Sequence, residues 1–158
     1  MTDKIRAGVI GATGYTGAAM LEVLVRHPSV ELRFATTRQP DLAGKNVYLE
    51  HPNLLDLTEL KFTLYDPERS AFSQVNEAVL KQARDSDVTF ICVPSGASVN
   101  ISRDLVGYDT RLIDTSADFR LKDPARYNRI GRSGILHWIS VAICWSVLSR
   151  FELKCVQA

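Results

Sequence analysis

The chain has 158 residues, the usual size of one domain and enough to bury a hydrophobic core. Its 19 basic and 18 acidic residues nearly cancel to a net charge of +1, and 46% of the residues are hydrophobic. This balance argues against a nucleic-acid-binding surface and against a disordered chain.

The cysteines and histidines indicate neither a disulfide framework nor a metal site. Cys92, Cys144 and Cys155 are an odd number with no C-x-x-C spacing, which is typical of free thiols in a reducing cytoplasm. The three histidines are scattered, with no cysteine nearby at zinc spacing. Glycines interrupt the first apolar run, and no segment reaches the roughly 20 apolar residues of a membrane span. We therefore expect a cytoplasmic protein without a metal ion, a secretory peptide or a membrane partner.

The chain opens with a predicted strand, a glycine turn and a helix. Arg6–Ile10 is a short buried strand, and Gly11–Gly17 follows it directly. The helix after Gly14 places apolar residues on one face and ends at His27-Pro28, because the residue before a proline disfavours helical geometry.

The rest of the N-terminal part alternates strands and helices. In chain order we predict a strand from Val30, a strand over 60–64 that could lie at an edge, a helix over 73–84, a strand over 88–93, a short helix over 98–106 capped by Gly107, and a strand over 111–114. This order predicts an α/β fold with a doubly wound, Rossmann-like, mostly parallel sheet. Its ligand crevice would lie at the carboxyl ends of the strands.

The chain changes character near Pro124, where we place a domain boundary. Residues 1–124 are predicted to form a dinucleotide-binding domain, and residues 125–158 an atypical tail. The tail holds both tryptophans and a single acidic residue, Glu152. Its apolar segment Ile135–Leu148 has neither a helical nor a strand period, so we expect it to cover the sheet or to drive self-association.

The glycine turn is the strongest functional signal. A strand that breaks into G-x-x-G-x-x-G and then opens a helix presents backbone N–H groups at the positive end of a helix dipole, which binds phosphate. The candidate cofactor-binding residues are Gly11, Thr13, Gly14, Tyr15, Thr16 and Gly17. The alternative is an ordinary strand–turn–helix whose glycines serve only the turn; the flanking strand and helix favour the dinucleotide site.

The end of the second strand bears on cofactor choice. An NAD site commonly has an acid there for the ribose 2′-hydroxyl, whereas a guanidinium accommodates a 2′-phosphate. Thr37 and Arg38 stand at this point and suit a phosphate monoester, so NADP is favoured over NAD. The alternative is that Arg38 is a solvated loop residue.

Two further loops follow the later strands. Pro94, Ser95 and Gly96 could support the nicotinamide ribose, or could form a turn chosen for its backbone alone. Ser116 lies in the polar segment 114–120, beside the expected nicotinamide end, where Asp118 and Arg120 could instead pair and stiffen the loop. Cys92 is inside an apolar run and is interpreted as a small core residue.

Together these motifs resemble one family, the N-acetyl-gamma-glutamyl-phosphate reductases. The segments that carry the resemblance are Ile10–Gly17, Leu24–Pro28, Thr37-Arg38, Ala43–Lys45, His51–Leu54 and Asp114–Pro124. The run Ser116-Ala117-Asp118-Phe119-Arg120-Leu121 is the most specific, and Ser95 stands where the family often has histidine. The resemblance implies an NADPH-dependent enzyme that reduces an acyl phosphate to a semialdehyde in arginine biosynthesis, with close relatives acting on the aminoadipyl homologue in lysine biosynthesis.

The resemblance also implies a catalytic cysteine that this sequence does not show. In the family, a cysteine preceded by glycine takes the acyl group as a thioester, and hydride from NADPH releases the aldehyde. Cys144 has no preceding glycine and no adjacent cation to lower its pKa, so no catalytic residue is assigned. We expect a truncated form that keeps cofactor binding. The alternatives are an aspartate-semialdehyde dehydrogenase-like fragment, against which residues 116–124 argue, and a non-catalytic NADP-binding module.

Overall fold

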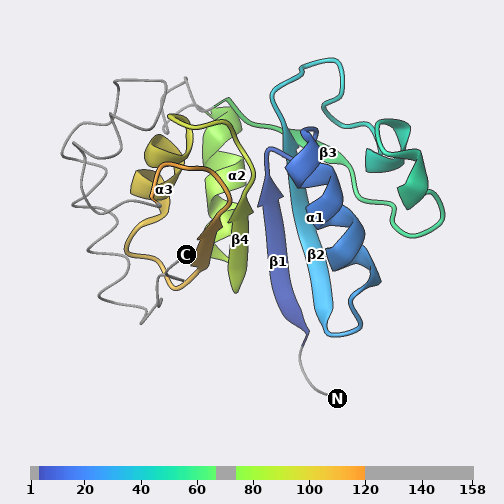
Figure 1. The fold of residues 1–158 in the computed structure, drawn as a ribbon, viewed down its shortest axis with the longest axis horizontal. Coiled ribbons are helices and arrows are strands. Elements are labelled where there is room, and N and C mark those ends of the chain that lie inside the picture. The colour runs from blue at the N-terminus through green and yellow to red at the C-terminus, as the bar shows by residue number, and fades with distance from the viewer. Residues whose placement is uncertain (1–3, 67–73, 120–158) are drawn as a thin grey trace.

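The structure, a computed structural model, describes residues 4–66 and 74–119 and contains one parallel sheet with the strand order β3-β2-β1-β4-β5 (Figure 1). The elements are β1 (Ile5–Ile10), α1 (Tyr15–Arg26), β2 (Val30–Thr37), β3 (Phe62–Leu64), α2 (Gln74–Arg84), β4 (Val88–Ile91), α3 (Ser98–Leu105) and β5 (Arg111–Asp114). Two short 3-10 helices, Val47–Leu49 and Pro52–Leu54, lie in the connection from β2 to β3. The doubly wound α/β prediction is therefore confirmed.

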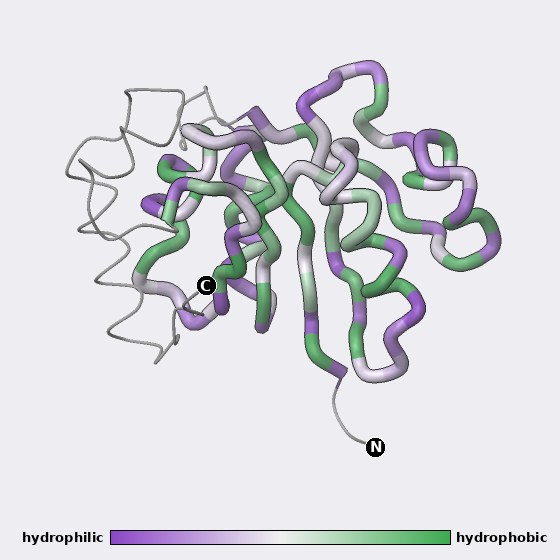
Figure 2. Tube along the Cα trace, viewed as in Figure 1, coloured by the Kyte–Doolittle hydropathy of each residue, from purple (hydrophilic) through white to green (hydrophobic). Residues whose placement is uncertain are grey.

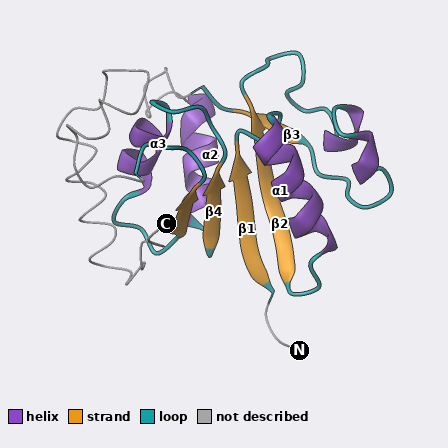
Figure 3. Ribbon diagram, viewed as in Figure 1, coloured by secondary structure: helices purple, strands orange, loops and turns teal. Residues whose placement is uncertain are grey.

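The sheet reverses its direction of growth between β1 and β4. The chain first adds β2 and β3 on one side of β1, then crosses over and adds β4 and β5 on the other side. Ligands of doubly wound sheets bind at such a switch point, outside the carboxyl ends of the strands. Figure 3 shows the loops that follow β1, β2 and β4 gathered at this edge.

Hydrophobic clusters cover both faces of the sheet. One joins the sheet to α1 and to the β2–β3 connection; it includes Ala7, Val9, Leu21, Leu24, Val47, Leu54 and Phe62. The other joins the sheet to α2 and α3; it includes Ile10, Phe34, Val79, Leu80, Ile91, Ile101 and Leu105. Figure 2 shows hydrophobic residues recurring along β1 and β4, as expected of strands buried on both faces.

The predicted elements are recovered with small shifts at their ends. β3 is indeed an edge strand, and α1 ends at Arg26, just before His27. Gly107, with φ +97°, follows the C-cap of α3. β4 stops at Ile91 instead of Val93. The Cys92 N–H still donates to the Ile10 carbonyl at 2.8 Å, but β1 ends at Ile10 and offers no further partner.

One glycine inside β1 is required by packing. The pairing of β1 with β2 shifts register between Ala7 and Gly8, so that Gly8 stands opposite Phe34. A Cβ atom at Gly8 would overlap the Phe34 ring, which is fully buried on the face of α2 and α3. The absence of a side chain in β1 therefore makes room for an aromatic ring from β2.

Candidate functional site

The three glycines of the turn after β1 have different roles. Gly11 has φ +85°, and a Cβ there would overlap the Cys92 carbonyl. Gly17 is buried, and its Cβ would overlap the Gly11 carbonyl and lie 2.7 Å from the Ala12 Cα. Gly14 is exposed, with only the Gly11 oxygen near its Cβ position, at 3.8 Å. Gly11 and Gly17 are therefore needed by the fold, whereas Gly14 leaves open space at the surface.

That open space adjoins the uncapped N-terminus of α1. Gly14 is the N-cap residue and has no side chain to cap the helix, and no acidic residue lies in the first turn. The first intrahelical donor is Ala18, whose N–H bonds the Gly14 carbonyl at 2.8 Å. No hydrogen bond within the described residues uses the N–H of Tyr15 or Thr16. These donors and the helix dipole are suited to bind an anion such as a pyrophosphate.

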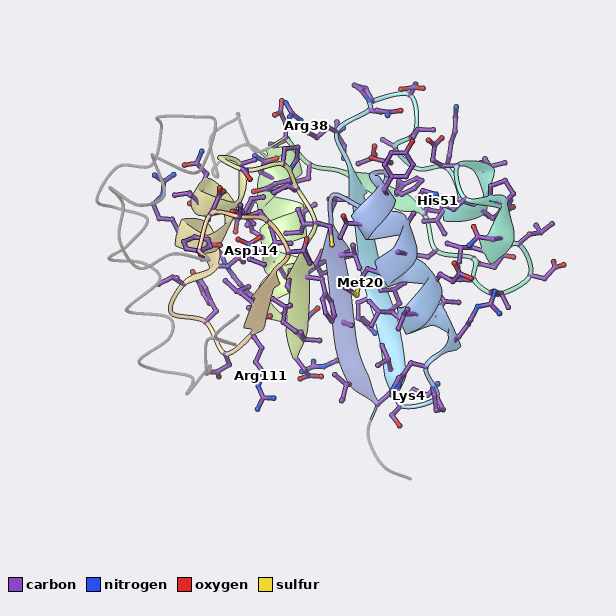
Figure 4. All side chains as sticks on the ribbon, viewed as in Figure 1. Lys4, Met20, Arg38, His51, Arg111 and Asp114 are labelled. Carbon is purple, nitrogen blue, oxygen red and sulfur yellow. The ribbon has the colours of Figure 1, made fainter. Side chains whose placement is uncertain are left out.

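The turn is held from behind by Thr36 and His51, and the sequence predicted no role at the turn for either residue. The Thr36 hydroxyl accepts the Gly11 N–H at 3.0 Å, and the Thr36 carbonyl accepts the Ala12 N–H at 2.9 Å. On the other side, His51 Nε2 donates to the Ala12 carbonyl at 2.9 Å. Figure 4 places His51 on the side of the sheet that α1 covers. The backbone of the turn is therefore fixed without using its outward-facing donors.

The last residue of β2, Thr37, and the first residue of the loop after it, Arg38, are the two residues expected at the adenine ribose. The Thr37 side chain is buried; its hydroxyl accepts the Gln39 N–H at 3.0 Å and so shapes the loop. Arg38 is half-exposed at the carboxyl end of β2 (Figure 4), with Nη2 4.0 Å from Asp66 Oδ1. The structure thus presents the guanidinium of Arg38 at the surface and turns the Thr37 hydroxyl inward.

The turn after β4 lies across the switch point from this loop. Pro94, Ser95 and Gly96 are exposed, Gly96 has φ +95°, and the Ala97 N–H donates to the Pro94 carbonyl at 3.2 Å. The Gly96 N–H donates to Asp118 Oδ2 at 2.7 Å. The turn is therefore an outward-facing surface fixed by a residue from the loop after β5.

Ser116 lies behind that surface. It is buried, its hydroxyl donates to Asp114 Oδ2 at 2.8 Å, and it accepts the Asp118 N–H at 3.1 Å. Its Oγ is also 3.0 Å from the Ser98 Oγ. Ser116 thus organises the loop from within. The expected partner of Asp118, Arg120, lies outside the described residues.

Burial shapes the acid–base properties of this end of the sheet. Burial raises the pKa of Asp114; hydrogen bonds from Ser116 oppose that shift, and the charge of Asp118 adds to it. Burial also raises the pKa of the Cys92 thiol, which is 8% exposed and packs in the hydrophobic cluster on the α1 face. The interpretation of Cys92 as a core residue is confirmed, because a buried thiol with a raised pKa is a poor nucleophile.

Within the part of the chain that the structure describes, no helix is long and apolar enough to cross a membrane, and no group of acidic, histidine and cysteine side chains could hold a metal ion. The predicted tail, with Cys144, Cys155 and the apolar segment 135–148, lies outside the described residues.

Comparisons with known proteins bear on this site. The family model described as the NAD binding domain of semialdehyde dehydrogenase matches residues 6–154. A LysW-L-2-aminoadipate/LysW-L-glutamate phosphate reductase from Saccharolobus solfataricus is 39% identical over 127 residues. An N-acetyl-gamma-glutamyl-phosphate reductase from Methanosarcina mazei is 39% identical over 124 residues. These alignments cover 80% and 78% of this chain, which spans only 32% of the length of either relative.

A solved structure gives the same fold. Aspartate semialdehyde dehydrogenase with NADP, from Candida albicans, superposes with a TM-score of 0.54 over 80% of this chain and 36% of its own, at 16% identity. The resemblance to N-acetyl-gamma-glutamyl-phosphate reductases is confirmed by the curated relatives, and a nicotinamide dinucleotide cofactor by the family model. The chain belongs to the semialdehyde dehydrogenase family and matches its NAD-binding domain.

Proposed function

We propose that this chain is the NADPH-binding part of a reductase that converts N-acetyl-gamma-glutamyl phosphate to its semialdehyde in arginine biosynthesis. The observation that carries the proposal is the uncapped N-terminus of α1 at the switch point, with Gly14 leaving the space that a pyrophosphate needs. We call the open space between Gly14 and the N-terminus of α1 the phosphate cradle. A Cβ at Gly14 would project into this cradle, while no part of the described fold fills the space. The residues present therefore fit a dinucleotide.

The preference for the 2′-phosphorylated cofactor rests on the end of β2. Arg38 presents its guanidinium there, about half-exposed, and the Thr37 turn fixes the backbone that carries it. A 2′-phosphate would meet a bidentate, permanently charged donor in place of the acid that commonly marks an NAD site. Asp66 Oδ1 lies 4.0 Å from Arg38 Nη2, so its carboxylate would compete with the phosphate for the guanidinium.

The residues of this chain fit one of the two tasks of such a reductase, cofactor binding, and not the other, acyl transfer to a thiolate. Bound NADPH would supply the hydride, and a thiolate of the whole reductase would accept the acyl group. No Gly-Cys motif of that kind occurs in the sequence, and Cys92 is buried in the core. We therefore assign cofactor binding to this chain, and we expect no turnover from it alone.

The names of the relatives suggest a second acyl phosphate as the substrate of the whole protein. The Saccharolobus solfataricus and Methanosarcina mazei relatives are equally similar to this chain, and their names differ in the acyl group reduced. The aminoadipyl phosphate carried by LysW is therefore the alternative substrate of the whole protein. The cofactor site would be unchanged, because the acyl group lies beyond the nicotinamide.

Titration of the purified chain with NADPH and NADH, followed by fluorescence, tests the proposal. We expect saturable binding with NADPH preferred, and no NADPH oxidation above the buffer blank when N-acetyl-gamma-glutamyl phosphate is added. Absence of NADPH binding by the folded chain would refute the assignment. Turnover that is lost in Cys144→Ser would show that Cys144 is a working nucleophile.

A further inference from the structure

The helices α1 and α3 follow β1 and β4, the strands on the two sides of the switch point, and their N-termini differ. The N-terminus of α1 has no acidic partner among the described residues and faces outward. The N-terminus of α3 is covered by the carboxylate of Asp118, whose Oδ2 accepts the Ser98 hydroxyl at 2.6 Å and the Gly96 N–H at 2.7 Å. Only the first is open to a phosphate.

The Asp118 carboxylate is buried and its position is fixed from several sides. Asp118 is 3% exposed and Ser98 is fully buried. The backbone N–H of Asp118 donates to the Ser116 hydroxyl. The start of the same loop is fixed by Thr115, whose N–H and hydroxyl both donate to the Ile91 carbonyl at 3.0 Å. A buried carboxylate with such short hydrogen bonds has little freedom to move, so the groups that donate to it are held in place as well.

One of these groups belongs to the turn 94–96, which would face the cofactor. Gly96 adopts φ +95°, and its N–H points back to Asp118, which leaves Pro94 and Ser95 exposed at the surface. The contact joins the loop after β5 to the turn after β4. It lies on the side of β1 away from β2 and Arg38. Asp118 is thus placed to affect one half of a dinucleotide and not the other.

We propose that Asp118 is a positioning residue for the nicotinamide half of the cofactor, acting through the Gly96 N–H on the turn 94–96. This inference rests on the proposed function. Asp118 itself would touch no cofactor atom. Removing its carboxylate frees the turn, while the phosphate cradle and Arg38 still bind the adenosine half.

The test compares two ligands that differ by that half. NADPH carries both halves, whereas adenosine 2′,5′-bisphosphate carries only the adenosine, its 2′-phosphate and the first phosphate of the bridge. Each ligand is titrated into the full chain and into Asp118→Ala, Asp118→Asn and Ser98→Ala. Asp109→Asn removes an exposed acid from the α3–β5 loop, which precedes β5 at the opposite edge of the sheet, and is the matched charge control. Circular dichroism establishes that each variant is folded.

We expect Asp118→Ala to weaken NADPH roughly tenfold, because a charge-assisted hydrogen bond is lost, and to change bisphosphate affinity by less than about twofold. Asp118→Asn keeps an oxygen acceptor and should lie between Asp118→Ala and the unchanged chain. It also serves as the test protein if Asp118→Ala does not fold. Ser98→Ala leaves the Gly96 bond in place and should have a smaller effect.

The possible failures can be told apart. Equal weakening of both ligands would mean that Asp118 merely supports the fold, and unchanged NADPH affinity would mean that the turn does not need it; either result overturns this inference alone. Failure of the unchanged chain to bind either ligand would overturn the proposed function and this inference with it.

Discussion

His51 and Ala12 are joined by a hydrogen bond of 2.9 Å between the imidazole Nε2 and the backbone carbonyl. Because a carbonyl only accepts, Nε2 must carry the proton. The histidine is buried and its ring meets Phe62 edge-on, with centroids 6.1 Å apart. A segment between β2 and β3 therefore holds the turn that follows β1.

Replacing His51 with phenylalanine should keep the ring packing and remove the donor. The Ala12 carbonyl then loses its partner, which costs about 1–3 kcal/mol for a buried group. We expect the free energy of unfolding, measured in urea, to fall by that order and NADPH binding to weaken. His51→Gln restores a donor and should recover part of both. Equal unfolding free energies for the phenylalanine variant and the unchanged chain would contradict this reading.

The glycine turn separates fold from binding. Gly14→Val should fold normally, because its Cβ meets only the Gly11 oxygen at 3.8 Å, yet its branched side chain fills the phosphate cradle and abolishes NADPH binding. Gly17→Val should fail to fold, because its Cβ would overlap the Gly11 carbonyl. Thermal melts by circular dichroism and NADPH titration measure the two effects. Unchanged NADPH affinity in Gly14→Val would show that the pyrophosphate does not bind at the glycine turn.

Cofactor choice should depend on Arg38. Arg38→Ala removes a charge-assisted contact to the 2′-phosphate worth about 1.5–3 kcal/mol, or roughly ten- to a hundredfold in NADPH affinity, and should hardly change NADH affinity. Arg33→Ala makes the same change of charge on β2, at an exposed arginine paired with Glu31, and serves as the control. If both dinucleotides weaken equally in Arg38→Ala, the guanidinium reads something other than the 2′-phosphate.

Acid stability should depend on Asp87 at the other end of the sheet. The Arg6 guanidinium donates to its carboxylate at 2.8 and 3.2 Å, and the Arg6 N–H donates at 2.7 Å. These bonds lower the pKa of Asp87 from 3.8 to about 2. Since the folded value is the lower one, the contribution is complete above pH 4 and is lost as the pH falls toward 2.

The effect is checked by urea midpoints between pH 2 and pH 6. Both side chains are about half-exposed, so the loss should be modest. Asp87→Asn should be less stable than the unchanged chain at pH 6 and should lose less stability on acidification. Parallel curves for the two proteins would show that this pair contributes nothing to acid sensitivity.

Local sequence patterns were enough to predict the helices, the strands and the glycine turn, but not the long-range hydrogen bonds that hold the candidate site in place. Hydrophobic period, glycine and proline act within a few residues, which is why the succession of strands and helices along the chain and the end of α1 could be predicted. Thr36, His51 and Asp118 act on Gly11, Ala12 and Gly96, across 25, 39 and 22 residues of sequence. No periodicity encodes such pairs. His51 and Asp118 both stand in segments that carry the family resemblance, but the resemblance did not say which backbone groups they bond.

Side-chain direction was equally hard to infer. Thr37 ends β2 and Ser116 lies in the loop after β5, as expected, but the hydroxyl of each is used in a hydrogen bond that shapes its own loop. Short hydroxyls next to a turn readily bond nearby backbone and side-chain groups, and the sequence does not say whether they face inward or outward. Their direct contact with a cofactor remains a prediction, whereas Gly14 and Arg38 are exposed where one is needed.

The crossover from β3 to β4 bears on the order in which the molecule assembles. β1 pairs with β4 through residues such as Ala7 and Val88, so the partners come from distant parts of the chain. Closing so long a loop is slow compared with forming α1 beside β1 and β2. The glycine turn therefore gains its opposite wall only late in folding. NADPH fluorescence should thus rise in the last kinetic phase of refolding, after most helical circular dichroism has returned.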